Sequence, residues 1–119
     1  MIRGAHTMYY SSKAEELRAF LRDKLQFPFT DVRDGWLIFN LPEADLGVHP
    51  TDDPQSQPSG TAHISFYCDD IQNTVQDLKA RGVKFTQEIS EHDWGFVTEF
   101  EVPGGFEIML YEPKYQKKG

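Results

Sequence analysis

A chain of 119 residues is long enough for one domain with its own hydrophobic core. Its formal charge of −7, from 19 acidic and 12 basic residues, argues against binding to nucleic acids or anionic membranes. The single cysteine, Cys68, excludes an intrachain disulfide, and no apolar run has the length of a membrane span or the pattern of a signal peptide. We therefore expect a cytoplasmic protein.

The first half of the chain begins with a predicted strand and helix. Residues 2–10 are rich in β-branched and aromatic side chains, which favour a strand. Ser12 and Glu15 have the spacing of a capping box, and apolar residues at helical spacing carry the predicted helix to about Leu25. Three strands are expected next, at about 29–33, 36–41 and 45–49. Asp34-Gly35 is a two-residue hairpin turn between the first two, and the proline-rich residues 50–60 predict a linker.

The second half repeats this order. Residues 61–68 predict a strand, and Asp69 or Asp70 is placed to cap a helix that runs to Arg81 and stops at Gly82. Three more strands are expected at about 83–88, 95–102 and 106–112, with a turn at 103–105.

Two βαβββ modules therefore follow one another, at about 1–50 and 61–113, with a tail at 114–119. His6 and His63 lie 57 residues apart, the same offset that separates the predicted caps Ser12 and Asp69. Since a repeat this short cannot bury its apolar face alone, we predict a single α+β domain. Its two modules form one curved, mostly antiparallel sheet, a cup with the helices on its outer face.

Several motifs resemble those of the vicinal oxygen chelate superfamily, which contains glyoxalases, bleomycin-resistance proteins and extradiol dioxygenases. The motifs are Cys68-Asp69-Asp70-Ile71 before the second helix, Gly82-Val83-Lys84-Phe85 after it, the turn Asp93-Trp94-Gly95-Phe96, and Pro103-Gly104-Gly105 before the last strand. The resemblance implies a cup-shaped sheet that holds a divalent metal, with ligands from the first and last strands of each module.

By this resemblance the candidate metal ligands are His6, His49, His63 and Glu107. Imidazole and carboxylate ligands suit Fe, Mn, Ni, Co or Zn. His6, His63 and Glu107 alone would form a two-histidine, one-carboxylate face, and His49 would bring the set nearer to a glyoxalase arrangement. An ungapped match places the family's ligand glutamate on Met109, two residues after Glu107, so a bulge near the two glycines would be needed to correct the register.

The favoured hypothesis is a metal-dependent enzyme for a small organic substrate, either a lyase or isomerase of glyoxalase type or a ring-cleaving dioxygenase. Glu107 and Tyr67 are its candidate catalytic residues, with Glu99 as a further possible base and Tyr111 as a hydrogen-bond donor. The first alternative is a metal-free protein that sequesters a planar compound, and the second is an accessory domain acting through a protein surface. Trp94 is expected in the core or the cup wall, His92 at the surface, and the chain in a homodimer.

Overall fold

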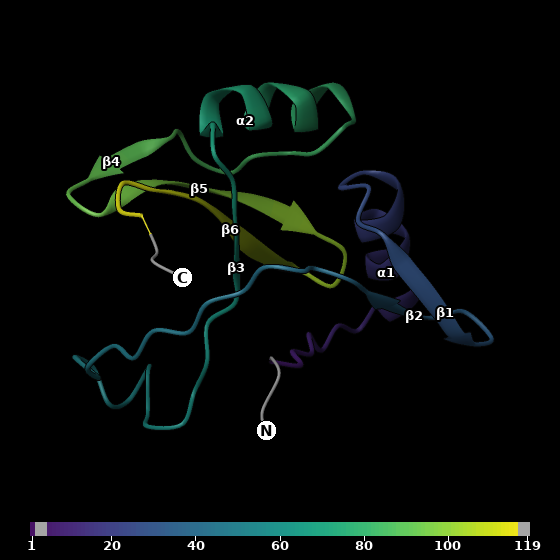
Figure 1. Cartoon of the computed structure of the whole chain (residues 1–119), viewed down its shortest axis with the longest axis horizontal. Helices are drawn as coiled ribbons and strands as arrows, with labels where there is room; N and C mark the ends of the chain where they lie inside the picture. The colour runs from purple at the N-terminus through teal and green to yellow at the C-terminus, as the bar shows by residue number, and fades with distance from the viewer. Residues whose placement is uncertain (2–4, 117–119) are drawn as a thin grey trace.

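The computed structural model describes residue 1 and residues 5–116 (Figure 1). The predicted α+β class is confirmed, with two helices and two sheets in these residues. In chain order the elements are α1 (Ala14–Asp23), β1 (Phe29–Arg33), β2 (Trp36–Phe39), β3 (Ser65–Tyr67), α2 (Ile71–Ala80), β4 (Ser90–His92), β5 (Gly95–Val102) and β6 (Phe106–Pro113). Neither helix in this part of the chain has the length and apolar character needed to cross a bilayer.

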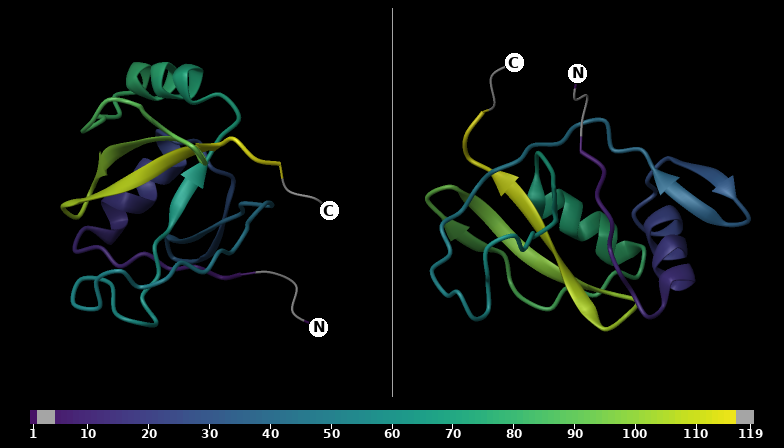
Figure 2. Two further views of the ribbon diagram at one scale, coloured as in Figure 1. Left: turned by 90° about the vertical axis from the view of Figure 1, so that its left-hand side faces the viewer. Right: turned by 90° about the horizontal axis from the view of Figure 1, so that it is seen from below.

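The second half forms a four-stranded sheet in the order β3-β6-β5-β4. β3 runs parallel to β6, whereas β5 pairs antiparallel with both β6 and β4. α2 lies across one face of this sheet, as the two views of Figure 2 show. The βαβββ order predicted for residues 61–113 is therefore present in the described chain.

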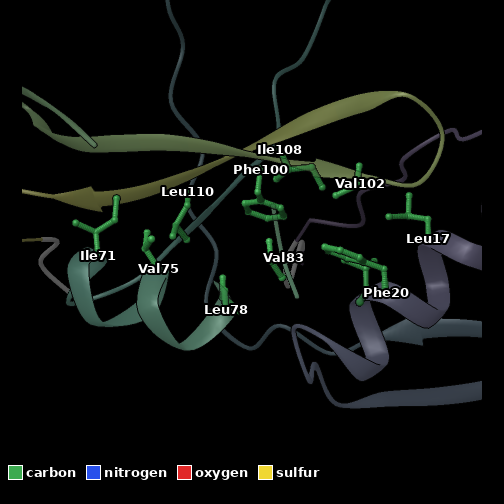
Figure 3. Packing of buried hydrophobic residues seen from close by; sticks show 11 residues of the cluster. Leu17, Phe20, Ile71, Val75, Leu78, Val83, Phe100, Val102, Ile108 and Leu110 are labelled. Carbon is green, nitrogen blue, oxygen red and sulfur yellow. The ribbon is translucent and has the colours of Figure 1, made fainter. Parts of the chain in front are cut away.

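The hydrophobic core lies between this sheet and both helices (Figure 3). Side chains at even positions of β5 and β6 point into it, and Phe100 and Ile108 are each only 1% exposed. α2 contributes Ile71, Val75 and Leu78, and α1 contributes Leu17, Phe20 and Leu21. The first helix is thus buried against strands of the second half.

In the first half, only the middle pair of predicted strands forms. β1 and β2 make a separate antiparallel hairpin, whose Asp34-Gly35 turn has both residues at positive φ, as predicted. The predictions of strands at 5–10 and 45–49 are wrong, because both segments lack regular structure, and residues 2–4 lie outside the described chain. Tyr9 explains the first case: its ring packs on Phe106 and its hydroxyl donates to the Ile64 carbonyl, so a side chain fixes this segment.

The two helix starts also differ from each other. The predicted Ser12–Glu15 capping box does not form: α1 begins after Lys13, and no side chain caps it. The neighbouring Ser11 instead donates from Oγ to the Pro103 carbonyl, so this serine links the helix start to the β5–β6 turn. At α2, the carboxylate of Asp70 accepts from the Asn73 backbone N–H at 3.1 Å, which confirms that cap.

The remaining differences between the predicted and the observed elements concern where strands begin and end. The strands at 29–33 and 95–102 have the predicted bounds, but those expected at 36–41 and 61–68 are shorter. The strand expected at 83–88 is reduced to an isolated bridge between Phe85 and Phe100. Pairing with β5 resumes only at 90–92, in a strand that was not predicted.

Candidate functional site

The side of the sheet opposite α2 is the candidate site, and we call it the open face. It carries the odd-numbered side chains of β5 and β6, because successive residues of a strand point to opposite sides. Ser65 pairs with Met109, and Tyr67 with Tyr111, so the odd positions of β3 share this face. In the right-hand view of Figure 2, β5 and β6 lie in front of α2. The open face comprises Ser65, Tyr67, Val97, Glu99, Glu101, Glu107, Met109 and Tyr111.

An aromatic wall stands at one end of the open face. Trp94 is 47% exposed, and its ring lies parallel to that of His92, with 4.8 Å between the ring centres. The Trp94 ring also lies 5.6 Å from that of Tyr111, which in turn lies 6.3 Å from the ring of Tyr115. Gly95 makes this approach possible, because an added Cβ would lie 2.5 Å from Cε1 of Tyr111. The wall consists of His92, Trp94, Tyr111 and Tyr115.

Carboxylates occupy the other end of the open face. Glu101 pairs with Glu107 across β5 and β6, and Glu99 lies on the same face two residues along. A hydrogen bond between the Glu99 and Glu107 side chains raises the pKa of Glu99, and desolvation and repulsion from Glu107 act in the same direction. The Thr86 hydroxyl donates to Oε2 of Glu107 at 3.0 Å. This end of the face is therefore a region of negative potential.

Tyr67 and Tyr111 connect the open face to residues 40–49. The Tyr67 hydroxyl donates to Oε2 of Glu43 at 2.9 Å. Burial raises the pKa of Tyr111, with further contributions from Tyr115 and from the negative charge of Asp45. The Tyr111 phenol therefore stays neutral near pH 7, and both tyrosine hydroxyls can act as hydrogen-bond donors. Glu43 was not singled out from the sequence.

The four predicted metal ligands do not meet at one point. His6 and His49 lie in exposed segments without regular structure, and Nδ1 of His49 is 2.6 Å from the carbonyl oxygen of Pro50. His63 is exposed and precedes β3 by two residues, whereas Glu107 lies in β6. Within residues 1 and 5–116, no three histidine, cysteine, aspartate or glutamate side chains are grouped to hold a metal. The described chain therefore does not bring the four predicted ligands together, and their metal-binding roles stay a prediction.

The register of β6 also bears on Glu107. Pairing of β5 with β6 is continuous from Val102 opposite Phe106 to Gly95 opposite Pro113, so no bulge moves Glu107 into the place of Met109. Ser65 pairs with Met109, and His63 and Glu107 each lie two residues earlier. A continuation of that pairing would set His63 beside Glu107 on the open face.

His92 is the site residue whose surroundings the sequence did not predict. It lies at the surface, as expected, but its ring stacks on Trp94, and its position opposite Gly95 places it at the end of the open face. The position of His92 was not predicted because β4, which carries it, has only three residues and was not recognised as a strand. The short turn at Asp93-Trp94, together with a strand on its N-terminal side, would have indicated this pairing.

Comparison with known proteins shows the family. Residues 3–110 match the model of the Glyoxalase/Bleomycin resistance protein/Dioxygenase superfamily. The chain belongs to this superfamily. Its Asp-Ile, Trp-Gly and Pro-Gly-Gly motifs are the ones that resemble those of the family.

Individual relatives are distant. A stretch of 70 residues is 30% identical to the uncharacterized protein YetH of Bacillus subtilis (strain 168), covering 59% of this chain and 58% of that protein. TnmS3, an antibiotic binding protein from Streptomyces sp. CB03234, has a similar structure with a TM-score of 0.62, 21% identity, and coverage of 96% of this chain and all of that chain. A superfamily member from Sphaerobacter thermophilus DSM 20745 has a TM-score of 0.59 and 25% identity, with 93% and 98% coverage of the two chains.

Proposed function

We propose that this protein binds a small organic compound with a flat aromatic ring and a positive charge, and holds it on the open face without altering it covalently. The observation that carries the proposal is the presence, on one face, of an aromatic wall at one end and carboxylates at the other. The fold that it shares with an antibiotic binding protein supports the same class of function.

The aromatic wall is suited to a flat ring. Trp94 is half exposed, and its contacts with His92 and Tyr111 already restrict its side chain, so it loses little side-chain freedom when a ligand stacks on it. Aromatic pairs contribute about 0.5–1.5 kcal/mol beyond the burial of their area. A cation over an indole ring adds roughly 0.5–2 kcal/mol, the larger value when water is excluded.

The charge preference follows from a comparison of two tryptophans. Trp94 shares its face of the sheet with Glu99, Glu101 and Glu107, whereas Trp36 of β2 has the guanidinium of Arg18 4.6 Å from its ring centre. A hollow at Trp36 is lined by Arg18, Val32, Arg33, Asp34 and Trp36. An approaching cation is therefore attracted at Trp94 and repelled by the two arginines at Trp36.

The proposal is tested by fluorescence titration with three probes. Proflavine is a flat cation, anthracene-9-carboxylate a flat anion, and tetramethylammonium a cation without a ring. We expect proflavine to bind most tightly, with an affinity that falls as salt is added. Equal affinity for proflavine and the anthracene carboxylate would contradict the charge assignment, and absence of binding by all three would contradict the proposal.

Two matched variants locate the binding. Trp94→Ala should weaken proflavine binding by about tenfold, because it removes a stacking contact worth roughly 1.4 kcal/mol. Trp36→Ala is the control, since Trp36 is 48% exposed and Trp94 is 47% exposed. The Glu99→Gln/Glu107→Gln double variant should weaken proflavine binding and strengthen that of the anthracene carboxylate, because it removes negative charge from the open face. A larger loss in Trp36→Ala than in Trp94→Ala would place binding at the hairpin.

The second candidate is the metal-dependent lyase, isomerase or ring-cleaving dioxygenase predicted from the sequence. It is favoured by one observation, the pairing of Ser65 with Met109, which would set His63 beside Glu107 if β3 continued by two residues. Three assignments remain predictions. They are the metal-binding roles of His6, His49, His63 and Glu107, the catalytic roles of Glu107 and Tyr67, and the cytoplasmic location.

Elemental analysis separates the two candidates. Protein purified without chelator and without a histidine tag is assayed for Fe, Mn, Ni, Co and Zn, and the assay is repeated on His63→Ala. One metal ion per chain that disappears in the variant would favour the enzyme. Metal at trace levels in both proteins, with proflavine binding intact, is the result expected for the binding protein.

A further inference from the structure

The hollow at Trp36 is large enough to hold a small molecule and lies away from the open face. Its volume is about 630 Å³, within the range of roughly 300–1,000 Å³ that is usual for ligand pockets. Helix α1 forms one side of it through Arg18, and the hairpin forms the other through Val32, Arg33, Asp34 and Trp36. In Figure 1 the hairpin and β4, the strand that leads into the aromatic wall, lie at opposite ends of the molecule. The hollow is therefore separate from the site described above.

Two arginines lie beside Trp36. The Arg18 guanidinium lies 4.6 Å from the centre of the indole ring, and Arg33 is the cross-strand partner of Trp36. Stacking on a ring leaves the N–H donors of a guanidinium free, because they lie in its plane and point outward from its edge. The hollow therefore offers positively charged hydrogen-bond donors next to an aromatic surface.

Neither of these guanidiniums has a hydrogen-bond or ion-pair partner among the residues that the structure describes. The same part of the chain contains two further arginines, and both are paired. Arg22 donates to both carboxylate oxygens of Asp23, and Arg81 donates to the Lys24 carbonyl oxygen. Arg18 is moreover half-buried. Because a partly desolvated cation without a partner costs free energy, an oxyanion that binds beside it would offset that cost.

We propose that this hollow is a second binding site, and that its ligand is a small phosphate ester of an aromatic or apolar group. A phosphate dianion carries two negative charges and three terminal oxygens, which match two guanidiniums, whereas a carboxylate offers one charge and two oxygens. The organic group of the ester would lie on Val32 and on the Trp36 ring, which are 57% and 48% exposed. The volume of the hollow also exceeds what a phosphate ion alone would fill.

Asp34 also lines the hollow, and its carboxylate limits the affinity for an anion. Its backbone φ of 46° is left-handed, a conformation that asparagine tolerates as well as aspartate does. Asp34→Asn therefore removes the repulsion and keeps the turn. It provides a test by gain of binding, which a damaged fold would not produce.

The test is a titration of the ¹⁵N-labelled protein with 1-naphthyl phosphate and, separately, with inorganic phosphate. The chain has two tryptophans, so their indole N–H signals report on the two sites separately. We expect 1-naphthyl phosphate to shift the Trp36 signal more than the Trp94 signal, and to bind at least about threefold more tightly than inorganic phosphate, because its ring buries apolar surface. An unchanged Trp36 signal, a larger shift at Trp94, or equal affinity for the two phosphates would each overturn the proposal.

Matched variants assign the phosphate to the two arginines of the hollow. Arg18→Gln and Arg33→Gln should each weaken 1-naphthyl phosphate binding by about tenfold, because each removes a charged hydrogen-bond donor. Arg22→Gln is the control: it makes the same change of charge on α1, outside the hollow, and should alter the affinity by less than about twofold. Asp34→Asn should strengthen binding by about threefold. An equal loss in Arg22→Gln would show that net charge alone is responsible, and unchanged or weaker binding in Asp34→Asn would place the phosphate elsewhere. Either result would overturn the proposal.

Discussion

The last strands predicted for the two halves share an apolar residue at every second position but have opposite surroundings. In β6, Ile108 and Leu110 are 1% and 4% exposed, whereas Leu46 and Val48 in the corresponding segment of the first half are 90% and 95% exposed. The apolar residues in question are at positions 46 and 48 in one segment and at 106, 108 and 110 in the other. An apolar alternation therefore gives a segment the capacity to be a strand, but a surface that covers the apolar side decides whether the strand forms.

The position of the helices explains the difference. α2 covers the sheet of its own half, and α1 packs on that same core, where the Phe20 ring stacks on Phe100 with 6.2 Å between ring centres. The second half thus receives both helices. Of the strands predicted for the first half, only the hairpin, which closes locally, is formed in the described chain, and α1 contacts it through Arg18 over the Trp36 ring.

The largest expected difference in the free energy of unfolding is that between Phe100→Ala and Leu46→Ala. The first variant empties the centre of the core and should lower the free energy of unfolding by about 3–5 kcal/mol. The second removes an exposed side chain and should change it by less than about 0.5 kcal/mol in dilute, monomeric protein. Urea unfolding followed by circular dichroism measures both. Comparable losses would mean that Leu46 is buried in the monomer.

Gly95 in β5 and Gly47 in the first half differ in the space that they leave for a side chain. A Cβ at position 95 would lie 2.4 Å from the Glu112 carbonyl oxygen, whereas position 47 has no heavy atom within 4 Å. Gly95→Ala should therefore cost about 1–3 kcal/mol of stability, as overpacking does. Gly47→Ala should be neutral or slightly stabilising, because it only restricts the unfolded chain. Thermal unfolding of the two variants decides, and a harmless Gly95→Ala would contradict the close approach of β5 and β6.

The two predicted helix caps, Asp70 and Ser12, should differ by a smaller amount in their contribution to the free energy of unfolding. Asp70 accepts a hydrogen bond from the Asn73 backbone, so Asp70→Ala should lower the free energy of unfolding by about 1 kcal/mol. No side chain caps α1, so Ser12→Ala should change it by less than about 0.5 kcal/mol. Chemical denaturation measures both variants. Equal losses would show that Ser12 does cap α1.

The smallest effect concerns pH. Glu107 raises the folded-state pKa of Glu99, so the folded protein holds that proton more tightly than the unfolded chain does. The resulting stabilisation is fully present below the ordinary pKa of a glutamate and is lost as the pH rises through the raised pKa. Glu99→Gln should therefore flatten the dependence of stability on pH in that window and raise stability at pH 7 by about a few tenths of a kcal/mol. An unchanged pH dependence would mean that the two carboxylates do not interact.

The sequence predicted those parts of the fold whose determinants are local. The hairpin turn at Asp34-Gly35, the cap at Asp70 and the strand 95–102 depend on neighbouring residues or on a long alternation, and they are confirmed. The strand at 45–49 depends on what covers it, which its own residues do not specify.

The candidate site was predicted in outline. Tyr67, Tyr111, Glu99 and Glu107 were candidate site residues from the sequence, and the structure brings them to one face. Stacking of His92 on Trp94 was missed because a strand of three residues leaves almost no signal in the sequence. The convergence of His6 and His49 on that face was expected from the sequence repeat, and in the described chain both lie in exposed segments that have not formed strands.

Chemical-shift mapping of proflavine on the ¹⁵N-labelled protein tests the central claim most directly. Binding on the open face predicts that the largest shifts fall on amides of β3, β5 and β6 and on the indole N–H of Trp94, while α1 and the hairpin stay unchanged. The largest shifts at Arg18, Arg33 and the indole of Trp36 would place the ligand at the hairpin instead and contradict the assignment of the open face as the functional site.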